Sequence, residues 1–404
     1  MFNFRQQLSF VIAIPIINVI ADTTQNYFVP GFASPGYVRA LLILIFIFIC
    51  FKGYYRNNSI NNLIMISLVY YFIISLFSSD LFYTQSIFLK YFIASMMFPI
   101  GYFYINTSDR FKLFLKAMVW VLGIYVISLL ISNIFKLGTS DYLGGTIFFG
   151  AGRVNITKGM VLILMMFPLL FKNEPAGNKR TILFSIFLCG MIFVFLGVKR
   201  SALLGLILGY ITYAYLTPYR TKFIKSLVGI IALIYLLSPL YFDVLTKRFT
   251  ARQEEGRFDI SQAKEEEARL NELETVLNAF VEGNISYKLF GAELFNGKSY
   301  FKTTRILHTD YATMFSGSGL IGFSFFMAIY AMMIFKVIYF YKKINDPEIK
   351  NMLSVSVSLI FALLIMGIAG VVHEISHRAI VFMFCGASIS VAKNHISHVL
   401  KSTI

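Results

Sequence analysis

Runs of mostly apolar residues, each about as long as a bilayer is thick, follow one another along most of the chain. A helix needs about 20 such residues to cross the hydrocarbon core. Twelve segments approach this length: 8–21, 38–52, 60–79, 83–106, 113–135, 158–171, 181–198, 201–217, 223–242, 318–341, 352–372 and 379–392. The pattern predicts an all-α polytopic membrane protein with about twelve transmembrane helices. Arg5 precedes the first run as in a signal peptide, but no small-residue cleavage site follows, so we expect a retained helix.

Positively charged residues alternate with these runs in a way that indicates a topology. With the N-terminus placed in the cytoplasm, 18 of the 36 Lys and Arg residues fall on that side, and the short loops on the other side hold far fewer. This distribution follows the positive-inside rule. It predicts that both termini are inside and that one long outer loop covers about residues 243–317.

The predicted outer loop contains ten Lys/Arg and twelve Asp/Glu, so we expect it to face water. Within it, apolar residues between Leu270 and Val281 recur at spacings of three and four, which predicts an amphipathic helix. From Asn284 to Tyr300 the sequence favours Gly- and aromatic-rich turns. No repeat divides the chain, so we expect residues 1–404 to form a single integral membrane domain that includes the loop.

Composition narrows the class of protein further. Hydrophobic residues make up 57% of the chain and charged residues only 14%, whereas soluble domains carry roughly 25% charged residues. An ordinary soluble enzyme is therefore excluded. The formal charge of +16 is assigned to loop cations that set topology, so no nucleic acid partner is expected. Cys50, Cys189 and Cys385 all lie within apolar runs, which argues against a disulfide framework or a thiolate metal site.

Ionisable residues near the ends of spans are functional candidates because their burial in a membrane is costly. Lys199 and Arg200 interrupt an otherwise apolar stretch at the predicted outer face. They fit either a simple turn between two spans or an anion site at the mouth of the bundle. Further polar residues on that face are Arg153, Lys158, Arg269, Arg305, His308, His373, His377 and Arg378.

Two motif matches are interpreted as accidental. His373-Glu374-Ile375-Ser376-His377 fits the H-E-x-x-H pattern of zinc proteases. A catalytic zinc needs a third ligand, and no Asp or Glu follows His377. Gly317-Ser318-Gly319-Leu320-Ile321-Gly322 fits G-x-G-x-x-G, but it opens a predicted membrane helix, where small residues allow close helix packing.

Three segments together resemble the O-antigen polymerase and O-antigen ligase superfamily of bacterial envelope glycosyltransferases. They are Val198-Lys199-Arg200-Ser201-Ala202-Leu203-Leu204, Glu267-Ala268-Arg269-Leu270, and His308-Thr309-Asp310-Tyr311 followed by Gly319-Leu320-Ile321-Gly322. Their order, their spacing and their common predicted side carry the resemblance, which covers roughly residues 140–392. This chain has Thr309 where Asn is commonest in the family. The resemblance implies a GT-C-like fold.

The resemblance also implies the donor, an oligosaccharide on undecaprenyl diphosphate, and an inverting, metal-independent transfer without a cofactor. Such a transfer needs a base for the attacking hydroxyl and positive charge for the leaving diphosphate. His308 is the expected base, and Arg200 and Arg269 are the expected catalytic cations. Expected further contacts to the diphosphate or the acceptor come from Arg153, Lys199, Arg305, Asp310, Glu374 and Arg378.

Simpler interpretations of these residues stay open. His308 could merely cap the span that follows it. Arg269 could form a solvated salt bridge on its own helix with Glu265, Glu266 or Glu272.

The leading functional hypothesis is a polymerase of O-antigen or capsular repeat units, with a chain-length regulator as a possible partner. The alternative is a ligase that transfers the glycan to lipid A-core, because the single large outer loop resembles the ligase layout. Remote alternatives are a transporter or flippase of lipid-linked sugars and a membrane zinc protease. The expected location is the bacterial inner membrane, with many spans and the active site on the periplasmic side.

Overall fold

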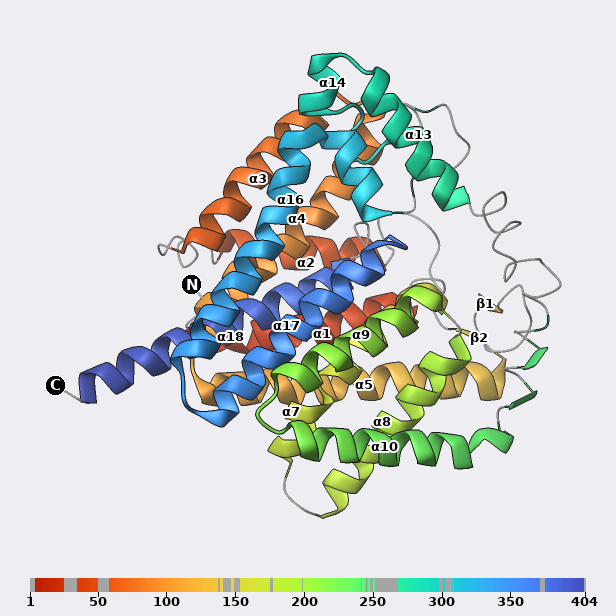
Figure 1. Cartoon of the computed structure of the whole chain (residues 1–404), viewed down its shortest axis with the longest axis vertical. Helices are drawn as coiled ribbons and strands as arrows, with labels where there is room; N and C mark the ends of the chain where they lie inside the picture. Colours follow the sequence, from red (N-terminus) through yellow and green to blue (C-terminus); the bar gives the residue numbers. More distant parts are fainter. Residues whose placement is uncertain are drawn as a thin grey trace.

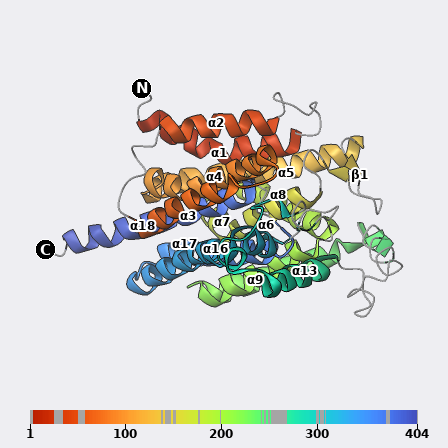
Figure 2. The ribbon, with the colours of Figure 1, turned by 90° about the horizontal axis from the view of Figure 1, so that it is seen from above.

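The computed structural model describes residues 4–24, 35–49, 58–136, 139–140, 147–148, 153–174, 177–197, 199–240, 242–243, 246–247, 250, 268–297, 301, 307, 309–370 and 375–402. Figure 1 shows a helical bundle with α14 at one end of its long axis and α10 at the other, and Figure 2 shows it from above.

The first half of the chain forms α1 (Phe4–Thr24), α2 (Pro35–Ile49), α3 (Ser59–Ser75), α4 (Leu81–Tyr104), α5 (Ser108–Phe135), the strands β1 (Thr139–Ser140) and β2 (Ile147–Phe148), α6 (Arg153–Met165), α7 (Phe167–Asn173) and α8 (Asn178–Gly197). The second half forms α9 (Arg200–Leu216), α10 (Arg220–Leu236), the 3-10 turn η3 (Ser238–Leu240), α13 (Ala268–Glu282), α14 (Ile285–Phe290), α16 (Asp310–Lys343), α17 (Pro347–Gly367) and α18 (Ile375–Ser402). The two strands pair antiparallel, Thr139 opposite Phe148.

The helices confirm a polytopic membrane protein. Among the described residues, seven helices are long and apolar enough to cross a bilayer, and α6 and α7 form an eighth candidate that is bent by 53°. The shorter apolar helices α2, α3 and α9 coincide with further predicted runs. Every one of the twelve runs overlaps a helix or the bent pair. The number of twelve spans and the sides on which their ends lie stay predictions.

Side-chain caps explain where many of these helices begin. At five helix starts the N-cap side chain accepts a hydrogen bond from a backbone N–H of the first turn. The N-cap residues are Asn58 for α3, Asp80 for α4, Thr107 for α5, Thr309 for α16 and Asp346 for α17. Such caps satisfy donors that the helix itself leaves unpaired and contribute about 1 kcal/mol each.

The centre of the bundle is the pair α4 and α18. Both glycines at their crossing are required, because a Cβ on Gly101 would overlap the carbonyl of Met383 and one on Gly386 would overlap the carbonyl of Phe98. Toward the C-terminal ends of both helices, Asn394 of α18 donates to the carbonyl of Asn106, just beyond α4, at 2.8 Å. The two helices therefore run parallel, and the spanning part of α18 is completely buried. In a membrane, small residues permit this close approach and the dispersion contacts that stabilise it.

Helix α16 is two helical segments joined at Gly319, whose φ of 63° and ψ of −169° are not helical. A positive φ is accessible to glycine at little cost. Two tyrosines of α3 donate to backbone carbonyls at this bend: the Tyr70 hydroxyl donates to Ser318 O at 2.8 Å and the Tyr71 hydroxyl to Gly322 O at 2.6 Å. The G-x-G-x-x-G match is thus a helix bend packed against α3.

The first segment of α16, residues 310–318, corrects one sequence prediction. Residues 310–317 were expected at the end of a water-facing loop, but most of them are buried, including Met314 at 0% exposure. The bend explains the difference, because it directs this segment back over the bundle. Side-chain hydrogen bonds from Ser316 and Ser318 to backbone carbonyls satisfy its polar groups.

The predicted amphipathic helix is present as α13, and its apolar side packs on that first segment of α16. Val276 is fully buried in a cluster with Leu307 and Ala312, and the rings of Phe280 and Phe315 lie 4.8 Å apart. Residue 276 contacts residues 307 and 312, and residue 280, one turn later, contacts residue 315. Helix α13 therefore runs parallel to this segment.

The region from Asn284 onward differs from the expected turns, because residues 285–290 form the short helix α14. Asn284 caps it by accepting from Tyr287 N at 2.8 Å, and Gly291 ends it with a φ of 75°. Tyr287 is buried, so packing stabilises a helix that local residues alone do not specify.

Glu293, just beyond α14, fastens this region to the turn between α3 and α4. Ser78 Oγ donates to Glu293 Oε2 at 2.8 Å, and Ser79 N donates at 3.0 Å. Burial raises the pKa of this carboxyl, but the hydrogen bonds from Ser79, Ser78 and Asn296 outweigh it, so the pKa lies below its usual value of 4.5.

Candidate functional site

Several helix ends that carry the polar residues singled out in the sequence meet around the C-terminal end of α17. We define this region, residues 364–370, as the α17 end. The Tyr311 hydroxyl donates to Leu364 O at 2.6 Å, which brings the start of α16 to it. Lys158 reaches it from the start of α6. The antiparallel helix α9 brings its own start alongside, because Gly205 faces Met366 and Ala362. Figure 1 shows α17, α18 and α9 lying together in the bundle.

A buried ion pair joins the first turn of α16 to the first turn of α18. Arg378 Nη2 donates to Asp310 Oδ2 at 3.3 Å, and the two side chains are 1% and 3% exposed. The guanidinium carbon also lies 4.8 Å from the centre of the Tyr91 ring and 5.6 Å from that of Phe326. Arginine suits such a place because its planar, weakly hydrated cation can stack on aromatic rings and hydrogen-bond at the same time.

Local sequence explains how Asp310 comes to this position. Thr309 caps α16 by accepting from Ala312 N at 3.0 Å, which makes Asp310 the first helical residue. An acidic side chain there is favoured by the positive end of the helix dipole. A Cβ at Gly367 would lie only 3.3 Å from Asp310 Oδ2, so the α17 end closes over the carboxylate.

Lys158 is the functional candidate that sequence reasoning undervalued. It was placed on the predicted outer face but not among the site residues, and it proves 1% exposed. Its ammonium donates to the carbonyls of Ala369 at 3.2 Å and Gly370 at 2.6 Å. A cation among the last carbonyls of a helix is favoured by the helix dipole. The sequence signal that could have identified Lys158 was its position at the edge of the apolar run 158–171.

Lys199 and Arg200 lie between α8 and α9, a position that both the turn and the anion-site interpretations require. Lys199 is the N-cap of α9 and Arg200 its first residue, and the Arg200 side chain is exposed. Gly197, the last residue of α8, packs on Thr157 of α6, so this turn adjoins the helix that carries Lys158. The exposed Arg200 therefore stands close to a buried cation and to the α17 end.

Other predicted site residues are placed in part. Arg153 is the first residue of α6 and Arg269 the second residue of α13, and nothing is described of their side chains. Helix α13 runs parallel to the start of α16, so Arg269 lies about 10 Å along α13 from Val276, beyond the beginning of α16. His308, Arg305 and Glu374 lie outside the described residues, although Leu307 and Thr309 bracket His308.

A second buried polar cluster adjoins the first turn of α18, and the sequence analysis did not predict it. Arg39 of α2 and Asp22 of α1 form an ion pair with side chains 8% and 7% exposed. Ser376 donates to Asp22, and Arg39 donates to Ser376 Oγ at 3.3 Å. His377, the last residue of the H-E-x-x-H match, is buried beside them in sequence. Three consecutive residues of α18, from Ser376 to Arg378, are thus buried polar groups at the start of one helix.

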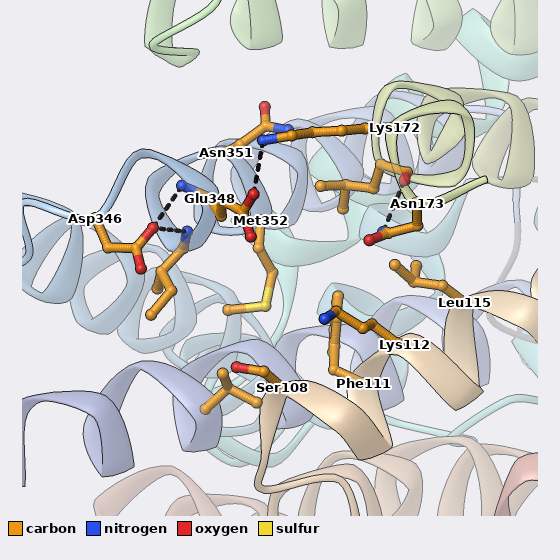
Figure 3. A pocket seen from close by; sticks show the side chains of 13 residues that line it. Ser108, Phe111, Lys112, Leu115, Lys172, Asn173, Asp346, Glu348, Asn351 and Met352 are labelled. Atoms are coloured by element: carbon orange, nitrogen blue, oxygen red, sulfur yellow. Dashed lines mark hydrogen bonds and ion pairs between the residues drawn. The ribbon is translucent and has the colours of Figure 1, made fainter. Parts of the chain in front are cut away.

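Two hollows lined by described residues lie toward the other end of α17. One, of about 90 Å³, lies between the starts of α5 and α17, where Lys172 pairs with Glu348 at 3.1 Å (Figure 3). The second, of about 380 Å³, lies between α7, α8, α9 and α10. Asn351, which lines both hollows, precedes Leu364 by 13 residues, or about 20 Å of helix. No group of three potential metal ligands occurs among the described residues.

Neither a comparison of the chain with models of protein families nor a comparison with curated proteins finds a match. The functional interpretation therefore depends on the residues and their geometry.

Proposed function

We propose that this protein is a membrane glycosyltransferase that uses an undecaprenyl-diphosphate-linked oligosaccharide as donor and polymerises O-antigen or capsular repeat units. Its acceptor is a second lipid-linked glycan. The reaction takes place at the outer face of the bacterial inner membrane, and the chain crosses that membrane about twelve times.

The observation that carries the proposal is the convergence at the α17 end. The starts of α6, α9, α16 and α18 contribute Lys158, Arg200, Asp310 and Arg378 to one region, although these residues are far apart in the sequence. Helix starts carry a partial positive charge, and one exposed arginine side chain can bind two phosphate oxygens at once. Such a region suits a diphosphate.

In the proposed reaction, a hydroxyl of the acceptor attacks the anomeric carbon of the donor sugar and inverts it. His308 accepts the hydroxyl proton, the new glycosidic bond forms, and the bond between the sugar and the lipid diphosphate breaks. Negative charge on the diphosphate grows as that bond breaks, and Arg200 and Arg269 stabilise it. Arg153, Lys199 and Arg305 add positive charge, and Glu374 binds an acceptor hydroxyl.

The Asp310–Arg378 pair is a positioning device in this mechanism. Both side chains are almost fully buried and paired through Arg378 Nη2 and Asp310 Oδ2, so they hold the start of α16 against α18. His308 precedes Asp310 by two residues, so the pair limits where the base can stand. Position matters because a displacement of about 1 Å can cost a hundredfold in rate.

A ligase that transfers the glycan to lipid A-core is the second candidate. The favouring feature is that a single long segment separates α10 from α16 and carries both Arg269 and His308. The donor and the roles of the residues are the same in both reactions.

The test is a gel of surface polysaccharide from a strain that lacks this protein, complemented with the wild type, His308→Ala or Arg200→Ala. A single repeat unit on the surface anchor with no ladder above it supports a polymerase. Long polymer that accumulates on the lipid carrier, with nothing attached to the anchor, supports the ligase. An unchanged ladder in the deletion strain contradicts both. Immunoblots of membranes establish that each variant inserts, and Lys225→Ala, an exposed residue on α10, is the control for an arbitrary loss of charge.

A further inference from the structure

The larger hollow, of about 380 Å³, is a candidate binding site at the end of the bundle away from the α17 end. Its volume falls within the range of roughly 300–1,000 Å³ that is typical of ligand pockets. Its lining comes from α7, α8, α9, the start of α10 and Asn351 of α17. It does not include any residue assigned to the proposed transferase.

The floor of this hollow is aromatic. Phe167 and Phe187 stack at 3.7 Å, and the ring of Tyr213 meets that of Phe223 edge-on at 4.6 Å. The tyrosine hydroxyls of the floor are engaged elsewhere: Tyr210 donates to Leu164 O at 2.9 Å and Tyr213 to Asn351 Oδ1 at 2.6 Å. The rings therefore offer apolar surface to an occupant.

The rim of the hollow is cationic. Lys172, Arg180 and Lys222 line it, and no carboxylate does so among the described residues. Glu348 and the Tyr219 hydroxyl hold the Lys172 ammonium at 3.1 and 2.9 Å, so part of its charge is balanced. Arg180 lies 4.0 Å over the ring of Phe171, and its Nε is buried without a hydrogen-bond partner among the described residues.

Two features of α10 indicate how an occupant would enter. Its N-cap, Tyr219, makes no side-chain cap, so the first-turn N–H groups at the rim can donate hydrogen bonds to an anion. Only Ile230 is buried on this helix, and apolar residues such as Val228 and Ile231 are exposed on its outer side. Such an apolar outer side is suited to contact with lipid chains next to the hollow.

We infer that this hollow binds an anionic phospholipid, with its phosphate between Arg180, Lys222 and the start of α10 and its hydrocarbon chain over the aromatic floor. A phosphate contacted by arginine makes charge-assisted hydrogen bonds, and the apolar rings exclude water from the chain. Free phosphate shares the headgroup chemistry but leaves the floor unoccupied. The inference does not depend on the proposed transferase activity.

The test uses the purified full-length protein in detergent and native mass spectrometry with three probes: phosphatidylglycerol, phosphatidylcholine and inorganic phosphate. Phosphatidylglycerol is expected to bind most tightly. The double variant Arg180→Gln/Lys222→Gln is expected to bind it roughly tenfold or more weakly. The matched control is Lys179→Gln/Lys225→Gln, which removes the same charge from exposed positions of the same two helices outside the lining. Its binding should equal that of the wild type.

A second pair of variants tests the floor independently of charge. Ser226→Trp fills the hollow from α10 and should also weaken binding of phosphatidylglycerol, whereas Val228→Trp, exposed on the same helix, should not. Equal binding of phosphatidylglycerol and phosphatidylcholine, or equal loss in both charge variants, overturns the inference. Phosphate binding as tight as that of phosphatidylglycerol, with no effect of Ser226→Trp, means that the site takes a free anion and overturns the lipid assignment.

Discussion

Two ion pairs at opposite ends of α17 show how differently this protein uses charge. Arg378–Asp310, beside the last turn, has side chains 1% and 3% exposed, whereas Lys172–Glu348, at the first turn, has side chains 41% and 68% exposed. A buried pair cannot lose one partner without leaving an uncompensated charge, while water screens an exposed pair. The buried pair beside the last turn of α17 is therefore suited to fixing geometry, whereas the exposed pair at its first turn can rearrange in water.

The largest expected effect is on catalysis. His308→Ala should lower the rate of transfer by about 10²–10⁴-fold, the usual contribution of a positioned base. The measurement is polymer formation by purified protein with lipid-linked repeat units. Glu348→Ala, which disrupts only the exposed pair, should keep most of the activity. A comparable loss of activity in both variants would contradict a functional difference between the two ends of α17.

The next largest expected effect is the loss of stability when the buried ion pair is broken. Asp310→Ala should lower the free energy of unfolding by about 3–5 kcal/mol, because it leaves the Arg378 guanidinium buried without its carboxylate. Denaturant unfolding of the detergent-solubilised protein measures this change. The double variant Asp310→Leu/Arg378→Met should be more stable than Asp310→Ala, since both charges are then removed. If the double variant were the less stable of the two, the burial argument would fail.

Close helix packing between the two ends gives a smaller effect. Gly386→Ala places a methyl group against the Phe98 carbonyl and should cost about 1–3 kcal/mol through overpacking of α4 on α18. The matched control is Gly123→Ala, which is buried on α5 but meets nothing within 4 Å. Thermal unfolding of both variants makes the comparison, and a control as unstable as Gly386→Ala would contradict it.

The exposed pair should contribute least to stability. Glu348→Ala is expected to change the free energy of unfolding by about 0.2–1 kcal/mol, and added salt should reduce the difference further. The measurement is the same denaturant series as for Asp310→Ala. A cost close to that of the buried pair would mean that exposure does not distinguish the two ends.

Glu293 provides a prediction for the region outside the predicted spans, because its contribution to stability depends on pH. Its pKa is lower in the folded protein than the usual 4.5, so the carboxylate stabilises the fold above that pH and loses this contribution as pH falls through the folded pKa. Glu293→Gln should therefore be less stable than wild type near neutral pH, and the gap should narrow in acid. Unfolding curves at several pH values test this, and a gap that widened below pH 4.5 would refute the assignment.

Parts of this architecture could be predicted from local signals. The apolar runs predicted the positions of helices, and the three- and four-residue spacing predicted α13. Thr309 and Asp346 occupy helix starts because their side chains cap free N–H groups, which is a local property. The turn at Lys199 and Arg200 also follows from two cations between apolar runs.

The candidate site was predictable as a set of residues but not as an arrangement. Arg378 and Asp310 were both singled out, yet nothing in the sequence pairs residues 68 positions apart. Lys158 looked like one more cation at a span end, and its burial against Ala369 and Gly370 depends on where α17 stops. The cluster of Asp22, Arg39 and Ser376 was missed because three separate helices contribute to it.

The sequence alone determined that this protein is a membrane protein of many helices, because each span must satisfy its own backbone hydrogen bonds and length and apolarity suffice to recognise it. Tertiary structure alone decided which helix ends meet. The bend at Gly319, held by Tyr70 and Tyr71 of α3, directs the start of α16 onto α18. Contacts between distant residues depend on packing that local residue patterns do not encode, and at the α17 end those contacts assemble the proposed site.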